Sequence, residues 1–105
     1  MKLPLIIASL LTAQERYDSI AFSECFSDDA VVFDEGRTYH GRDEIRQWNE
    51  MTNAKYKTKY KPLEISNSGD DLILTANISG TFDGSPATIK YNFVLKQGKI
   101  VSLRI

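Results

Sequence analysis

The hydrophobic pattern of this chain changes its period near Asn53, and this change constrains the fold more than any other feature. For most of the chain before Asn53, apolar residues recur every three or four positions, the spacing of amphipathic helices. After Asn53, apolar and polar residues alternate, as in strands that bury one face. Helices followed by one-sided strands indicate an α+β domain, in which helices cover the apolar face of a curved antiparallel sheet. At 105 residues, we expect a single domain, residues 1–105.

Helices are expected over residues 3–13, over about 17–27, and from Asp43 onward. The apolar positions of the third helix are Ile45, Trp48 and Met51. Residues 2–13 also resemble a short export signal, because one positive charge precedes an apolar run. No cleavage site follows that run, so we interpret it as a helix.

Strands are expected over residues 30–33, 38–39, 55–65, 72–82, 88–95 and 99–105. The lysines at positions 55, 57, 59 and 61 would then share one strand face. That face is either a solvated edge or a surface for an anion or a partner.

Composition excludes several functions. Thirteen basic against fourteen acidic residues give a net charge of −1, without the basic excess of nucleic-acid-binding or membrane-surface proteins. One cysteine and one histidine exclude an internal disulfide and a Cys/His zinc cluster. We therefore expect a cytoplasmic protein with no metal, cofactor, nucleic-acid or membrane partner.

Two runs near the middle of the chain carry a resemblance. They extend from Phe26 to Asp34 (FSDDAVVFD) and from Tyr39 to Trp48 (YHGRDEIRQW). With the last three strands, they resemble the nuclear-transport-factor-2-like superfamily, and its SnoaL-like branch in particular. The resemblance implies a cone-shaped fold whose curved sheet wraps around N-terminal helices and encloses a pocket. It also implies a homodimer formed through the sheet. The superfamily contains ketosteroid isomerases, polyketide cyclases and non-catalytic ligand binders, so function depends on individual residues.

Asp34 is the strongest candidate for catalysis. The resemblance aligns it with the general-base aspartate of the ketosteroid isomerases, and strand alternation aims it to the same side as Val32. A carboxylate in a partly apolar pocket can take a proton from carbon beside a carbonyl. Two structural alternatives remain open. Asp34 could open the turn at Glu35 and Gly36, or it could be a buried carboxylate bonded to Tyr39, His40 or an arginine.

The proton donor of such an enzyme is less clear. The isomerases' helix-borne tyrosine aligns with Leu10, which has no donor. Their second donor aligns with Tyr91, whose hydroxyl could stabilise an enolate or simply belong to the core. His40 could shuttle protons to Asp34, or it could be a surface residue.

The remaining candidates are ligand contacts, and they could equally be core residues. They are Tyr39, Trp48, Met51, Tyr60 and Phe93. Three functions remain. The first is binding of a small apolar or carbonyl-containing ligand, and the second is an isomerase, cyclase or dehydratase that uses Asp34 as its base. The third is a protein-interaction module on the outer sheet face.

Overall fold

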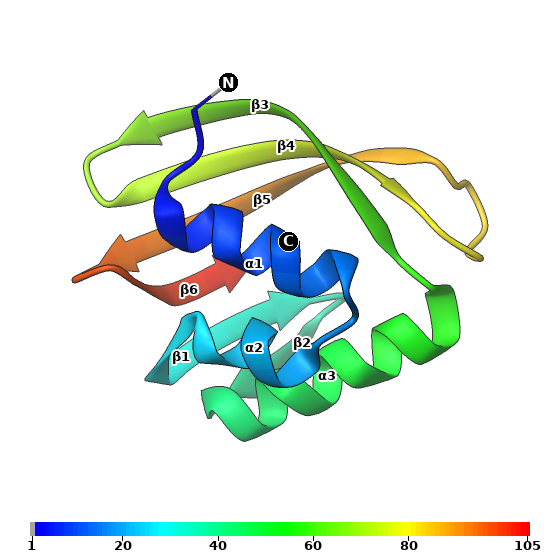
Figure 1. Cartoon of the computed structure of the whole chain (residues 1–105), viewed down its shortest axis with the longest axis horizontal. Coiled ribbons are helices and arrows are strands. Elements are labelled where there is room, and N and C mark those ends of the chain that lie inside the picture. The colour runs from blue at the N-terminus through cyan, green and yellow to red at the C-terminus, as the bar shows by residue number, and fades with distance from the viewer. Residues whose placement is uncertain (1) are drawn as a thin grey trace.

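The computed structural model describes residues 2–105. Its elements are, in chain order, α1 (Leu5–Glu15), α2 (Ser19–Glu24), β1 (Phe26–Asp34), β2 (Arg37–His40), α3 (Gly41–Tyr56), β3 (Lys59–Ser68), β4 (Asp71–Ser79), β5 (Ala87–Lys96) and β6 (Lys99–Arg104). In Figure 1, β3, β4 and β5 arch over α1, while α2 and α3 lie near β1 and β2. The predicted α+β class is confirmed. In this part of the chain, no helix is long and apolar enough to cross a membrane.

The strands lie in the order β2-β1-β6-β5-β4-β3 within the described residues. From β3 to β6 each strand pairs antiparallel with the next, as the alternating pattern predicts. β1 instead pairs parallel with β6, which an entirely antiparallel sheet would not contain. The parallel pair arises because α3 carries the chain from β2 to the far edge of the sheet. The meander that starts there ends with β6 beside β1.

The concave face of the sheet is apolar because apolar residues of neighbouring strands pair with one another there. Leu72 pairs with Phe93 and Leu74 with Tyr91, and all four side chains are at most 4% exposed. The intervening residues, including Ile73 and Thr75, lie on the opposite face. That outer face is the one through which we expect a second copy to bind.

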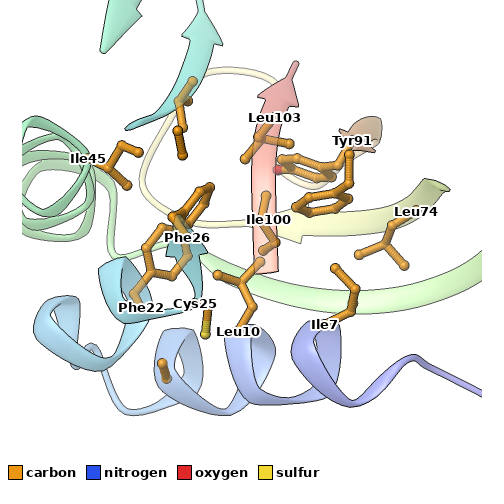
Figure 2. Packing of buried hydrophobic residues seen from close by; sticks show 14 of the residues in the cluster. Ile7, Leu10, Phe22, Cys25, Phe26, Ile45, Leu74, Tyr91, Ile100 and Leu103 are labelled. Carbon is orange, nitrogen blue, oxygen red and sulfur yellow. The ribbon is translucent and has the colours of Figure 1, made fainter. Parts of the chain in front are cut away.

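The helices cover the concave face with their apolar sides. Ile7 and Leu10 are 0% and 2% exposed, and Figure 2 shows both pointing from α1 toward the strands. The rings of Phe22 and Phe26 lie 5.6 Å apart, centroid to centroid. The helical interpretation of the N-terminal apolar run is therefore confirmed.

Two predicted boundaries are wrong. The second helix ends at Glu24 rather than near residue 27, and β1 begins at Phe26 rather than at residue 30, with an irregular register between Phe26 and Val31. α3 continues to Tyr56, so Lys55 is helical and Lys57 is its left-handed C-cap. The expected four-lysine strand face therefore does not form. The helix extends because Thr81, on the loop after β4, donates hydrogen bonds to the carbonyl oxygens of Lys55 (3.1 Å) and Tyr56 (2.7 Å).

Arg42 fixes the position of α3 against β1. Its Nε donates to the carbonyl oxygen of Phe26 at 2.8 Å, and its Nη1 lies 2.6 Å from Oδ1 of Asp28. Gly41 precedes it with a φ of 79°, and a Cβ there would lie 3.3 Å from the Asp28 carbonyl oxygen. Asp28, near the start of β1, and Gly41, the first residue of α3, thus have structural reasons to be present.

A buried polar network joins the helices on the same side of the sheet. Asn49 of α3 donates through Nδ2 to Gln14 Oε1 of α1 at 2.9 Å, and its Oδ1 accepts from Ser19 Oγ at 2.7 Å. Gln14 Nε2 in turn donates to Asn53 Oδ1 at 2.8 Å and to the Thr58 carbonyl oxygen at 3.1 Å. Because Gln14 and Asn49 are each 2% exposed, these bonds replace contacts with water.

We expect the N49A variant to lose about 2–4 kcal/mol of unfolding free energy, because removal of the Asn49 amide leaves its buried hydrogen-bond partners unpaired. Urea unfolding followed by circular dichroism measures the loss. The matched control is N92A, since Asn92 is exposed on β5 and should change stability by less than about 0.5 kcal/mol. A loss in N49A as small as in the control would contradict a structural role for the network.

Candidate functional site

Asp34 ends β1 on the concave side, since it shares the strand alternation of the fully buried Val32. Its Oδ2 accepts a hydrogen bond of 3.1 Å from Nε1 of Trp48. Burial raises the pKa of this half-buried carboxyl, the Trp48 hydrogen bond opposes that effect, and the nearby Glu35 adds to it. The net result is a pKa above the ordinary aspartate value.

The turn after β1 does not depend on Asp34. Glu35 and Gly36 have φ values of 51° and 76°, the backbone of a two-residue hairpin turn. The partner of Asp34 is Trp48, rather than the Tyr39, His40 or arginine considered from the sequence. Of the structural alternatives, a hydrogen-bonded and partly buried carboxylate is therefore the correct description.

Trp48 orients Asp34 from α3. The indole is 4% exposed, and its ring centroid lies 5.7 Å from that of Tyr39 and 6.2 Å from that of Phe22. A buried indole N–H requires an acceptor, which the carboxylate supplies. Trp48 is thus a core residue that also fixes the position of the candidate base.

Two tyrosines lie near Asp34 on the concave side. The rings of Tyr60, on β3, and Tyr91, on β5, are stacked with centroids 5.3 Å apart, so each hydroxyl affects the pKa of the other. Figure 2 shows Tyr91 among the core side chains, close to Leu103. Burial and the charge of Asp34 raise both pKa values, that of Tyr60 to about 12, while Tyr91 opposes the increase at Tyr60. Both hydroxyls therefore keep their protons at neutral pH.

His40 does not lie at this site. It pairs with Val31 on the face of the β1–β2 hairpin opposite to Asp34, and its side chain is exposed. Its backbone N–H donates to Glu44 Oε1 at 2.9 Å, at the start of α3. The structure thus corrects the expectation that His40 exchanges protons with Asp34.

A half-open groove of about 480 Å³ lies between α1 and β3. Its walls are formed by Leu3, Ala8, Leu11, Thr12, Gln14, Glu15, Lys59, Tyr60 and Pro62. Of the five expected ligand contacts, all within residues 2–105, Tyr60 lies in this wall and the other four do not. Met51 is 51% exposed, while Trp48 and Phe93 are buried in the core, so these residues do not enclose the expected cavity. This groove lies beside α1 rather than behind the helices.

Polar groups in the groove are few. Thr12 Oγ1 donates to the Ala8 carbonyl oxygen at 3.0 Å, and the amide of Gln14 belongs to the buried network. Lys59 Nζ lies 5.5 Å from the ring centroid of Tyr17, over its face. A mostly apolar wall with a few polar groups is typical of small-molecule sites.

The sequence reasoning missed Gln14 and Asn49, although a signal was present. Each follows a buried apolar residue by four positions, Gln14 after Leu10 and Asn49 after Ile45, so each lies within an apolar helical stripe. A polar residue in such a stripe needs a buried partner. Gln14 links the network to the groove wall.

Among residues 2–105, no three His, Cys, Asp or Glu side chains gather closely enough to hold a metal ion. The site therefore consists of one carboxylate, one indole, two phenols and an adjoining groove.

Comparisons with known proteins agree with the fold. The sequence model of the SnoaL-like domain family matches residues 7–103. A Sinorhizobium meliloti protein proposed to be a polyketide cyclase is 37% identical, with a TM-score of 0.93 over 97% of this chain and 94% of that chain. No curated protein matches the chain at a significant level.

Two more distant structures share the fold. A Catenulispora acidiphila protein with a ketosteroid isomerase-like fold, in complex with trimethylamine, is 21% identical, with a TM-score of 0.82 over 98% of this chain and 85% of that chain. A computationally designed 17-OHP binder is 16% identical, with a TM-score of 0.80 over 95% of this chain and 86% of that chain.

The raised pKa of Asp34 predicts a pH dependence of stability. Between the unfolded aspartate pKa of about 3.9 and the higher folded value, the folded state binds more protons than the unfolded state. The unfolding free energy of the wild type, minus that of D34N, should therefore fall as pH rises through this interval. The D34N amide keeps an oxygen acceptor for Trp48 and does not titrate. Urea unfolding of both proteins from pH 3.5 to 7 measures the difference, and a rise with pH would indicate a lowered pKa instead.

Proposed function

Since the chain belongs to the SnoaL-like domain family, we propose that it binds a small, mainly apolar ligand in the groove between α1 and β3. The observation that carries this proposal is the groove itself, whose volume of about 480 Å³ lies within the range typical of ligand sites. Leu3, Leu11 and Pro62 provide apolar surface, and Tyr60 provides an aromatic wall. The designed 17-OHP binder supports the proposal, because its fold is the same.

The groove can be filled from α1 without touching the core. Ala8 lies in the groove wall, whereas its neighbour Ser9 is exposed on another side of the helix. We expect A8W to weaken the binding of the neutral, fluorescent dye Nile red at least tenfold, because the indole occupies the ligand's space. S9W introduces the same side chain one residue away and should leave the affinity unchanged.

A fluorescence titration of the wild type, A8W and S9W with Nile red measures these affinities, after circular dichroism has verified that all three are folded. Equal affinities in the three proteins would place the dye outside the groove and contradict the proposal. Absence of binding to the folded wild type would also contradict it.

An acid–base enzyme is the second candidate, favoured by the half-buried Asp34 with its raised pKa beside two protonated phenols. The likeness to the Sinorhizobium meliloti protein, proposed to be a polyketide cyclase, also supports it. Asp34 would take a proton from the carbon beside a carbonyl, leaving an enolate, and return that proton in a second step. Asp34 does not belong to the groove wall, so a ligand in the groove does not contact it. For this reason we place binding first.

Deuterium exchange tests the enzyme. We expect the wild type to accelerate exchange of the α-protons of 2-tetralone in D2O, followed by NMR. D34N should lower the enzyme-dependent rate at least about 100-fold, since a general base contributes roughly 10²–10⁴. D29N removes a charge from the start of the same strand and should retain the rate. A wild-type rate equal to that of buffer, or equal rates in wild type and D34N, would exclude Asp34 as the base.

A further inference from the structure

The two ends of the groove differ in polarity. Figure 1 shows α1 beneath β3, with the two elements running in opposite directions. The side-chain amide of Gln14, near the end of α1, donates to the carbonyl oxygen of Thr58, just before β3. The next residues of these segments, Glu15 and Lys59, are the charged members of the groove wall and therefore lie at this end. Leu3, which precedes α1, lies toward the opposite and apolar end.

The uncharged polar side chains at the wall are already engaged within the protein. The amide of Gln14 accepts from Asn49 through Oε1 and donates through Nε2 to Asn53 Oδ1 and to the Thr58 carbonyl oxygen. The hydroxyl of Thr12 donates to a carbonyl oxygen of its own helix. Neither side chain has a further proton to donate. Recognition of a polar group on a ligand therefore falls chiefly to the charged side chains.

Lys59 presents an ammonium group at the charged end. Its Nζ lies 5.5 Å from the ring centroid of Tyr17, which places it beside the C-terminal end of α1. Among residues 2–105, both ion pairs are formed by Arg42 and Arg46, so neither Lys59 nor Glu15 takes part in one. An ammonium has three N–H groups, so contact with a ring leaves it able to bind an anion.

The charges around this end favour an anion over a cation. Arg16 and Lys57 are exposed in the two chain segments that meet there, together with Lys59. The acidic residues of these segments are Glu15 and Asp18. Asp18 Oδ1 accepts a backbone hydrogen bond of 3.0 Å at the start of α2, so this carboxylate is committed to capping that helix. Three cations thus stand against one uncommitted carboxylate.

We infer that the groove binds amphipathic anions, with the apolar tail along the wall toward Leu3 and the carboxylate at Lys59. This inference rests on the proposed function and specifies the class of ligand. Burial of the tail provides most of the affinity, because apolar surface leaves water. The ammonium provides selectivity between head groups, since an exposed ion pair adds little affinity by itself.

Three probes that share a ten-carbon chain separate the head group from the tail. Decanoate has an anionic head, decylammonium a cationic head and 1-decanol an uncharged one. We expect the wild type at pH 7 to bind decanoate at least fivefold more tightly than decylammonium, because Lys59 attracts the first head group and repels the second. Competition with Nile red, followed by fluorescence, measures the three affinities.

The K59Q variant tests the position of the head group. It should reduce the ratio of the decanoate affinity to the decylammonium affinity at least threefold and leave the affinity for 1-decanol unchanged. K61Q is the matched control, because Lys61 is exposed on the same strand but does not belong to the groove wall. It removes the same charge and should keep the ratio. Circular dichroism verifies that both variants are folded.

Three outcomes would overturn the inference. The first is that decylammonium binds the wild type as tightly as decanoate does. The second is a preference for decanoate that K59Q leaves intact, or that K61Q lowers as much as K59Q does. The third is a preference for decylammonium that is lost in E15Q, which would assign the charged end to cations through Glu15.

The uncharged probe separates this inference from the proposed function. If 1-decanol binds the wild type and A8W weakens its binding, the groove is a ligand site, and the two charged probes judge its selectivity. If none of the three probes binds the wild type, the proposed function fails, and the inference fails with it.

Discussion

The fold depends on covering the apolar concave face of one curved sheet with a single layer of helices. Leu72, Leu74 and their neighbours on β5 gain stability only when α1, α2 and α3 exclude water from them. No second layer of helices covers this face within the described residues, so each of the three helices must stay in its position. The network around Asn49 connects α1, α2 and α3, and Thr81 attaches the end of α3 to the loop after β4. These bonds give the apolar layer a defined arrangement, because apolar contacts alone are not directional.

The same constraint shapes the candidate site. Polar groups on the concave side must be paired, and Asp34 is paired with the indole of Trp48, while Tyr60 is paired with Tyr91. Pairing keeps these groups oriented, yet burial still raises their pKa values. The two phenols beside the carboxylate therefore stay protonated because they are packed in the interior. Of these residues, Tyr60 also forms part of the wall of the groove beside α1.

Much of the fold followed from the pattern of residues, whereas the site followed only in part. Alternation predicted that Asp34 would lie with Val32, and it does, because a strand has no other way to present its side chains. Sequence reasoning did not predict Trp48 as its partner, since the two are joined only when α3 packs on β1. His40 was either a proton shuttle for Asp34 or a surface residue, and the hairpin register turns it to the face opposite Asp34. Met51 follows Trp48 by three positions in the helix, yet it is exposed.

By itself, the sequence determined the α+β class, the faces of the strands and the apolar side of α1, because these depend on periodicities of two and 3.6 residues along the chain. Tertiary structure alone decided the parallel pairing of β1 with β6, the extension of α3 to Tyr56 and the meeting of Gln14 with Asn49. It also placed Tyr60 against Tyr91, across the width of β4. Each of these contacts joins residues distant in sequence, and which of them form depends on how the helices fill the curve of the sheet.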